Sequence, residues 1–126
     1  MTGAVEKAGD VGSLDVEGMR WTVNRLLDPD AVPDVLPPAA EEVRTLTAVL
    51  RGHLELLMPQ VERLAKRLPE SSIPRYCALA CLGEARERLR ASPSPAPGGD
   101  VAYARRLARA VNALCDDFEK LGKAAS

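Results

Sequence analysis

Residues 43–68 decide the fold, and they read VRTLTAVLRGHLELLMPQVERLAKRL. A stripe of mainly apolar residues recurs along them with spacings of 4, 3, 4, 3, 4, 3 and 4, the period of a helix that packs along one seam. The stripe consists of Val43, Thr47, Leu50, Leu54, Leu57, Val61, Leu64 and Leu68. We expect one helix from Ala39 to Leu68, about 45 Å long at 1.5 Å per residue. Pro59 removes one of its backbone hydrogen bonds, so a kink, or a break near Met58, is expected.

Three further segments show helical spacing, and none shows the alternation of a strand. The first helix is expected to begin after Asp15 as N-cap and to end before the Asp28-Pro29-Asp30 break. The next begins with Ser71 or Ser72 as N-cap and continues to about Arg90. The last is capped by Asp100 and ends at Gly122.

The segments between these helices are rich in proline, serine and glycine. Residues 28–38 and 92–99 are expected to be extended connectors, because proline fixes φ and lacks an amide donor. Residues 1–13 are expected to be a disordered leader, and residues 123–126 a tail. The sequence therefore predicts an all-α protein: one bundle of about four helices over residues 14–122, with a long kinked second helix.

The composition of the 126-residue chain is that of a small globular domain. A formal net charge of −1 and an aromatic share of 3% argue against a dedicated binder of nucleic acid or of an anionic membrane. The first ten residues carry charges instead of an apolar signal segment, and no run of about 18 apolar residues occurs. Three cysteines are an odd number, which favours reduced thiols. We expect a cytoplasmic protein.

Two consecutive segments carry more apolar surface than one small chain can cover. The long helix widens its stripe with Leu46, Val49, His53 and Leu56. In the following helix, residues 73–82 are apolar on every side except at Arg75, so they demand burial all round. We therefore expect self-association, most simply as a twofold homodimer, or binding to another helical protein. The expected core or contact residues are Leu50, Leu54, Leu57, Tyr76, Leu79 and Leu82.

Trp21 is the one large aromatic residue that does not follow the apolar face of its helix. It projects away from the face formed by Val16, Met19, Val23 and Leu26. Two interpretations stay open: the leader or a neighbouring helix covers Trp21, or Trp21 is an exposed anchor for a partner.

Cys77, Cys81 and His53 are the residues that could carry chemistry. Cys77 and Cys81 are four apart, a spacing that two metal ligands on one helix can use, but no CxxC pair accompanies them. Cysteines in such a helix are usually small buried hydrophobes, and His53 is expected to be neutral, with its N–H bonded to Tyr76 or to a backbone carbonyl. We assign no catalytic residue, no cofactor and no metal. One alternative function is a small-molecule pocket between the second and third helices, lined by His53, Tyr76 and Cys77.

Two groups of arginines suggest a second alternative, a DNA-associated regulator. They are Arg86, Arg88 and Arg90 in the third helix, and Arg105, Arg106 and Arg109 in the fourth. Acidic residues lie among or after them, and the connector between the two helices is too long for a helix-turn-helix. A solvated charged face is the simpler interpretation. If the protein bound DNA, it would be retained on a duplex-DNA column, and its affinity would fall steeply as the salt concentration rises.

The block RGHLELLMPQVERLAKRLPESSIPRYCALACLGEARERL, from Arg51 to Leu89, resembles a family of small actinomycete proteins of unknown function that are loosely described as natural-product biosynthesis proteins. The resemblance covers roughly residues 20–120, and its most distinctive part is RYCALACLGEAR, from Arg75 to Arg86. It implies a cytoplasmic bacterial protein with an accessory role in specialised metabolism, and it assigns no active-site residue. The leading expectation is thus a helical interaction or accessory protein that is not an enzyme.

Overall fold

The computed structural model describes residues 14–27 and 39–125, which form four α-helices. They are α2 (Val16–Leu27), α3 (Ala40–Lys66), α4 (Ile73–Arg90) and α5 (Gly99–Ala125). These two described ranges contain no strand, and the all-α prediction is confirmed. The leader expected at residues 1–13 and the connector expected at residues 28–38 lie outside the described residues.

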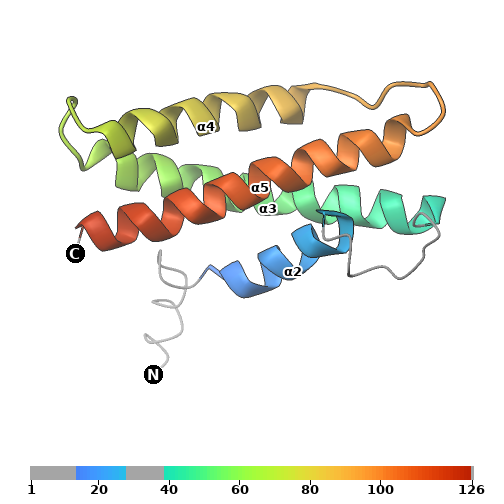
Figure 1. The fold of residues 1–126 in the computed structure, drawn as a ribbon, viewed down its shortest axis with the longest axis horizontal. Coiled ribbons are helices and arrows are strands. Elements are labelled where there is room, and N and C mark those ends of the chain that lie inside the picture. The colour runs from blue at the N-terminus through green and yellow to red at the C-terminus, as the bar shows by residue number, and fades with distance from the viewer. Residues whose placement is uncertain (1–13, 28–38, 126) are drawn as a thin grey trace.

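The helices form an antiparallel bundle with α3 and α5 at its centre (Figure 1). Helix α5 contacts each of the other three, while α4 covers one side of the α3–α5 pair and α2 covers the other. Helices α3 and α5 run in the same direction, and α2 and α4 run against them. This arrangement gives α3 two covered flanks, but α2 has only 12 residues and α3 has 27. Part of the α3 flank therefore extends beyond α2.

Helix α3 is continuous across Pro59, so the break expected near Met58 does not occur. The stripe of residues 43–68 faces the bundle centre, and Leu50, Leu54, Leu57 and Val61 have no exposed surface. Burial of this seam stabilises the helix by more than one missing hydrogen bond costs, because each fully buried leucine contributes about 1.5–3 kcal/mol. Packing therefore keeps the helix intact at Pro59.

Replacing Pro59 by alanine is expected to raise the free energy of unfolding by about 2 kcal/mol. Alanine restores an N–H that can bond the carbonyl of Glu55, and residue 59 is exposed, so little packing is lost. Urea unfolding followed by circular dichroism measures the change. Pro74→Ala is the control, because Pro74 lies in the first turn of α4, where proline is tolerated. A stability loss in Pro59→Ala would mean instead that the core is packed around a bend at Pro59.

Two of the expected N-caps are confirmed, and both ends of the last helix differ from expectation. The Asp15 side chain accepts from the amide of Gly18 at 3.0 Å, and Ser72 accepts from that of Arg75 at 3.2 Å. Helix α5, however, begins at Gly99 rather than after Asp100. The preceding residue, Gly98, turns the chain with a φ of 80°, a left-handed conformation that glycine adopts readily, and its carbonyl accepts the first helical bond.

At its other end, α5 continues past Gly122 to Ala125, so Gly122 is not the residue that ends the helix. A glycine inside a helix costs only about 1 kcal/mol relative to alanine. Leu121, the residue before it, is buried in the core. The packing of this last turn outweighs the cost of the glycine.

The C-terminal end of α4 is held by side chains from the two central helices. Arg51 of α3 donates to the carbonyl of Leu89 at 3.0 Å, and Tyr103 of α5 donates to the carbonyl of Arg88 at 2.8 Å. Arg51 also bonds the Tyr103 hydroxyl at 2.6 Å. The last carbonyls of a helix have no partner inside it and carry partial negative charge, so a guanidinium and a hydroxyl suit this position.

Candidate functional site

The leucines expected as core or contact residues fall into two groups. Leu50, Leu54, Leu57 and Leu82 are completely buried within the bundle. Leu79 is 36% exposed and lies at the edge of the buried side of α4, about 60° around the helix from Leu82. The first four therefore hold the monomer together, and only Leu79 is available to a partner.

The N-terminal half of α4 is buried on one side only, which is not the all-round burial that its sequence demands. Ala78 and Leu82 are in the core, whereas Ile73 and Tyr76 are each 74% exposed. We call the exposed side the outer face of α4. It consists of Ile73, Tyr76, Cys77, Leu79, Ala80 and Gly83, with no charged residue among them. The described residues leave this apolar helix face uncovered.

His53, Tyr76 and Cys77 are not brought together. Tyr76 and Cys77 point to solvent from α4. His53 is half-buried on the α2 side of α3, where Asp15 is the charged group that acts on it. The described cavities have other linings: one lies between α4 and α5, and others lie beside the start of α3 and residues 93–101. The structure thus gives no support to a pocket shared by these three residues.

Trp21 is 66% exposed, and its ring contacts Arg25, whose guanidinium carbon lies 6.0 Å from the ring centre. Arg25 in turn pairs with Glu42 of α3. No neighbouring helix covers Trp21, while the leader at residues 1–13 lies outside the described residues, so both interpretations of Trp21 stay open. On the neighbouring flank of α3, Val49 and Leu56 are 39% and 57% exposed. This flank is a second apolar surface, and it is interrupted by the polar His53.

Cys81 and Cys115 have raised thiol pKa values. The pKa of Cys81 is raised to about 12, mainly by burial and in part by its interaction with Asp117. Burial likewise raises the pKa of Cys115 to about 11. Since the thiolate is the nucleophile and the metal ligand, these raised pKa values keep the thiolate fraction of both side chains small at neutral pH. No group of three or more His, Cys, Asp or Glu side chains that could hold a metal ion occurs among the described residues.

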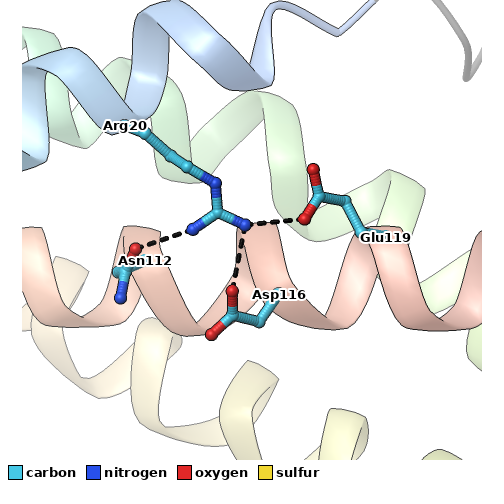
Figure 2. Close-up of polar contacts among 4 residues, drawn as sticks. All are labelled: Arg20, Asn112, Asp116 and Glu119. Carbon is cyan, nitrogen blue, oxygen red and sulfur yellow. Dashed lines mark hydrogen bonds and ion pairs between the residues drawn. The ribbon is translucent and has the colours of Figure 1, made fainter.

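Arg20 makes the largest polar network described, and the sequence analysis did not single it out. Figure 2 shows its guanidinium reaching from α2 to Asn112 at 2.9 Å, Asp116 at 2.9 Å and Glu119 at 2.8 Å on α5. These three residues follow one another at helical spacing, a polar stripe that could have indicated a cationic partner. The network joins α2 to α5, and its two carboxylates outnumber the single guanidinium of Arg20.

His53 makes stability depend on pH. Its Nε2 atom is buried and has no hydrogen-bond partner among the described residues, and burial lowers the pKa of the imidazole. The unfolded chain therefore binds a proton at higher pH than the folded one, and stability falls as pH drops below about 6.5. We expect His53→Leu to abolish this loss between pH 7.5 and 5, measured as the melting temperature at each pH.

Asp117→Asn provides the comparison of opposite sign. Burial raises the pKa of Asp117, so its carboxyl binds a proton more tightly in the folded protein, and stability falls as pH rises from the unfolded pKa of about 3.8 through the raised pKa. Removing the carboxyl should make the fall below pH 6.5 steeper or leave it as it is. If His53→Leu retains the wild-type slope, protonation of His53 is not its cause.

A family model matches residues 17–123, from the first turn of α2 to the last turn of α5. The chain belongs to DUF6415, a family of unknown function. No curated protein and no solved structure matches the chain. The DUF6415 region contains the outer face of α4 and the Arg20 network, so both lie within the part that defines the family. No helix of the described residues is long and apolar enough to cross a membrane.

Proposed function

We propose that this DUF6415 protein is a helical interaction protein, not an enzyme, and that it pairs with a second copy of itself through the outer face of α4. The exposure of Ile73 and Tyr76 carries the proposal: both are 74% exposed, more than Trp21, Val49 and Leu56, the large apolar residues of the second exposed surface. Contiguous exposed apolar surface on a small domain is a common sign of a docking site. Exposed tyrosine is also a residue type that is enriched at interface hot spots.

The outer face of α4 is complementary to itself in size. Two of its three large residues, Ile73 and Tyr76, precede two small ones, Ala80 and Gly83, by seven positions, or about two turns. In an antiparallel pair around a twofold axis at the middle of the face, Ile73 of one copy meets Gly83 of the other, and Tyr76 meets Ala80. The space at Gly83 is open, since a Cβ placed there would meet nothing within 4 Å. The large side chains of each copy would thus fill the space over the small residues of the other copy.

Charge also favours this pairing. The contacting faces of the two helices would contain no formal charge, because Arg75, the charged residue within positions 73–83, donates to the carbonyl of Leu68 instead. The charged residues of α4 from Glu84 onward would extend beyond the partner helix. One helix face is smaller than the roughly 800 Å² per partner of a standard stable interface. We therefore expect a reversible dimer with a dissociation constant in the micromolar range, and not an obligate one.

Sedimentation equilibrium between about 5 and 500 μM, in the presence of a reductant, tests the proposal. The reductant excludes disulfides through exposed Cys77. Wild-type protein should show a monomer–dimer equilibrium, and Tyr76→Glu should weaken it at least tenfold. Leu56→Glu is the matched control, because Leu56 is similarly exposed but lies on α3. Its circular dichroism and dimerisation should equal those of wild type.

Two results would contradict this dimer. One is a wild-type protein that stays monomeric at 500 μM. The other is a dimer that survives Tyr76→Glu but is lost in Leu56→Glu, which would place the contact on the α3 flank instead. Because both substitutions are at exposed positions, neither result depends on whether the variants fold.

The proposal extends to an accessory role in natural-product biosynthesis in the cytoplasm of a bacterium. It is supported by the resemblance of the Arg51–Leu89 block, which includes the whole outer face of α4. Deleting the gene in its own host and profiling the metabolites tests this role. We expect specialised metabolites to be lost and to be restored by Leu56→Glu but not by Tyr76→Glu. An unchanged metabolite profile would contradict the role and leave the dimer unaffected.

A further inference from the structure

A small cleft lies between α4 and α5, beside the outer face of α4 but separate from it. It has a volume of about 150 Å³. Glu84 and Arg88 of α4 and Arg106 and Arg109 of α5 line its polar part. We propose that this α4–α5 cleft binds a small organic anion through a phosphate or carboxylate group held by the three arginines. This site is independent of the proposed dimer.

The three arginines of the α4–α5 cleft have no acidic partner among the described residues, unlike Arg86 and Arg90 of α4. Arg86 pairs with Glu62, and Arg90 pairs with Glu87. By contrast, the guanidinium groups of Arg88, Arg106 and Arg109 have no hydrogen bond or ion pair with any described residue. Arg88 and Arg106 are also half-buried, so their charges are partly removed from water. Three cations gathered at one cleft with Glu84 as the single carboxylate of the lining repel one another, and a bound anion would relieve this repulsion.

The chemistry of the cleft indicates the class of ligand. Guanidinium groups present planar pairs of donors that match the oxygens of phosphate and carboxylate. The rest of the lining is small and uncharged. It consists of Ala110 and Ala113 on α5 and Cys81 on α4. Glu84 is the single acceptor, suited to a hydroxyl or ammonium group of the ligand. A cavity of about 150 Å³ accommodates a molecule near the size of benzene.

The charges around the cleft argue for a small ligand over nucleic acid. After Arg109, α5 continues with Asp116, Asp117 and Glu119. A duplex needs several phosphate contacts along an extended basic surface, and this surface turns acidic within two to three turns of the helix. The basic area is therefore of a size for one or two anionic groups.

Titration of the full chain with inorganic phosphate or with succinate, each at constant ionic strength against chloride, tests the proposal. We expect saturable amide shifts in ¹⁵N-correlation spectra at Cys81, Ala110 and Ala113. Arg106→Gln and Arg109→Gln should each weaken the affinity at least tenfold, the loss typical of one charge-assisted hydrogen bond. Arg90→Gln, which removes an equal charge from the same region of α4, should change it less than twofold.

The two probes separate the possible ligands: saturation by phosphate alone indicates a phosphoryl group, and saturation by succinate indicates a carboxylate. The proposal is overturned if neither anion shifts the cleft resonances more than chloride does. It is also overturned if Arg90→Gln weakens binding as much as Arg106→Gln, or if only duplex DNA shifts them. Repeating the titration with Tyr76→Glu, in which the cleft is intact, keeps this test separate from that of the dimer.

Discussion

Tyr103→Ala is expected to destabilise the protein by about 4 kcal/mol, a large part of the total stability of a domain of this size. The ring of Tyr103 is 2% exposed and fills the junction of α3, α4 and α5. Its hydroxyl donates to the carbonyl of Arg88 and accepts from Arg51. Alanine would leave both a cavity and unsatisfied polar groups at the end of α4. Urea unfolding monitored by circular dichroism should show a lower midpoint with an unchanged slope.

Two variants separate the contributions of ring and hydroxyl. Tyr103→Phe keeps the ring and removes the hydrogen bonds, and we expect a loss of about 1–3 kcal/mol. Tyr76→Ala, the same substitution at the other tyrosine of the chain, should cost less than about 0.5 kcal/mol, because Tyr76 is 74% exposed. Equal losses at Tyr103 and Tyr76 would contradict the placement of Tyr103 in the core.

Leu54→Ala is expected to cost about 3–5 kcal/mol, because Leu54 has no exposed surface and lies midway along the buried seam of α3. Leu56→Ala, two residues away on the exposed flank, should change the stability by less than about 0.5 kcal/mol. The pair has the same chemistry and nearly the same position in the chain, so the difference between them measures burial alone. Thermal unfolding at low protein concentration, where dimerisation is negligible, provides the measurement.

The local features of the fold were predictable from the sequence. The stripe of residues 43–68 identifies the seam of α3 because helical period and burial are coupled along one element. Asp15, and Ser72 as one of two candidates with Ser71, could be predicted as caps because their oxygens bond amides only three residues away. Asp100 was misassigned for a related reason: a capping side chain was present, but the turn at Gly98 starts the helix earlier.

The candidate sites depend on contacts between elements, and these were not predictable. The apolar half of α4 suggests burial on all sides, yet which side faces solvent depends on how α3 and α5 are placed. Arg88 and Arg106 are 18 residues apart in the sequence, and only the antiparallel course of α4 and α5 places them at one cleft. Arg20 likewise finds its acceptors more than 90 residues away. Nothing local distinguishes these arginines from those on a solvated face.

The central position of α5 has a consequence for biosynthesis. This helix leaves the ribosome after the other three, and each of them packs against it. Until translation reaches it, the leucine seam of α3 lacks its principal partner and is available for chaperones or for aggregation. Cotranslational folding of this domain should therefore be late and abrupt, with protease resistance appearing only once α5 has emerged from the exit tunnel.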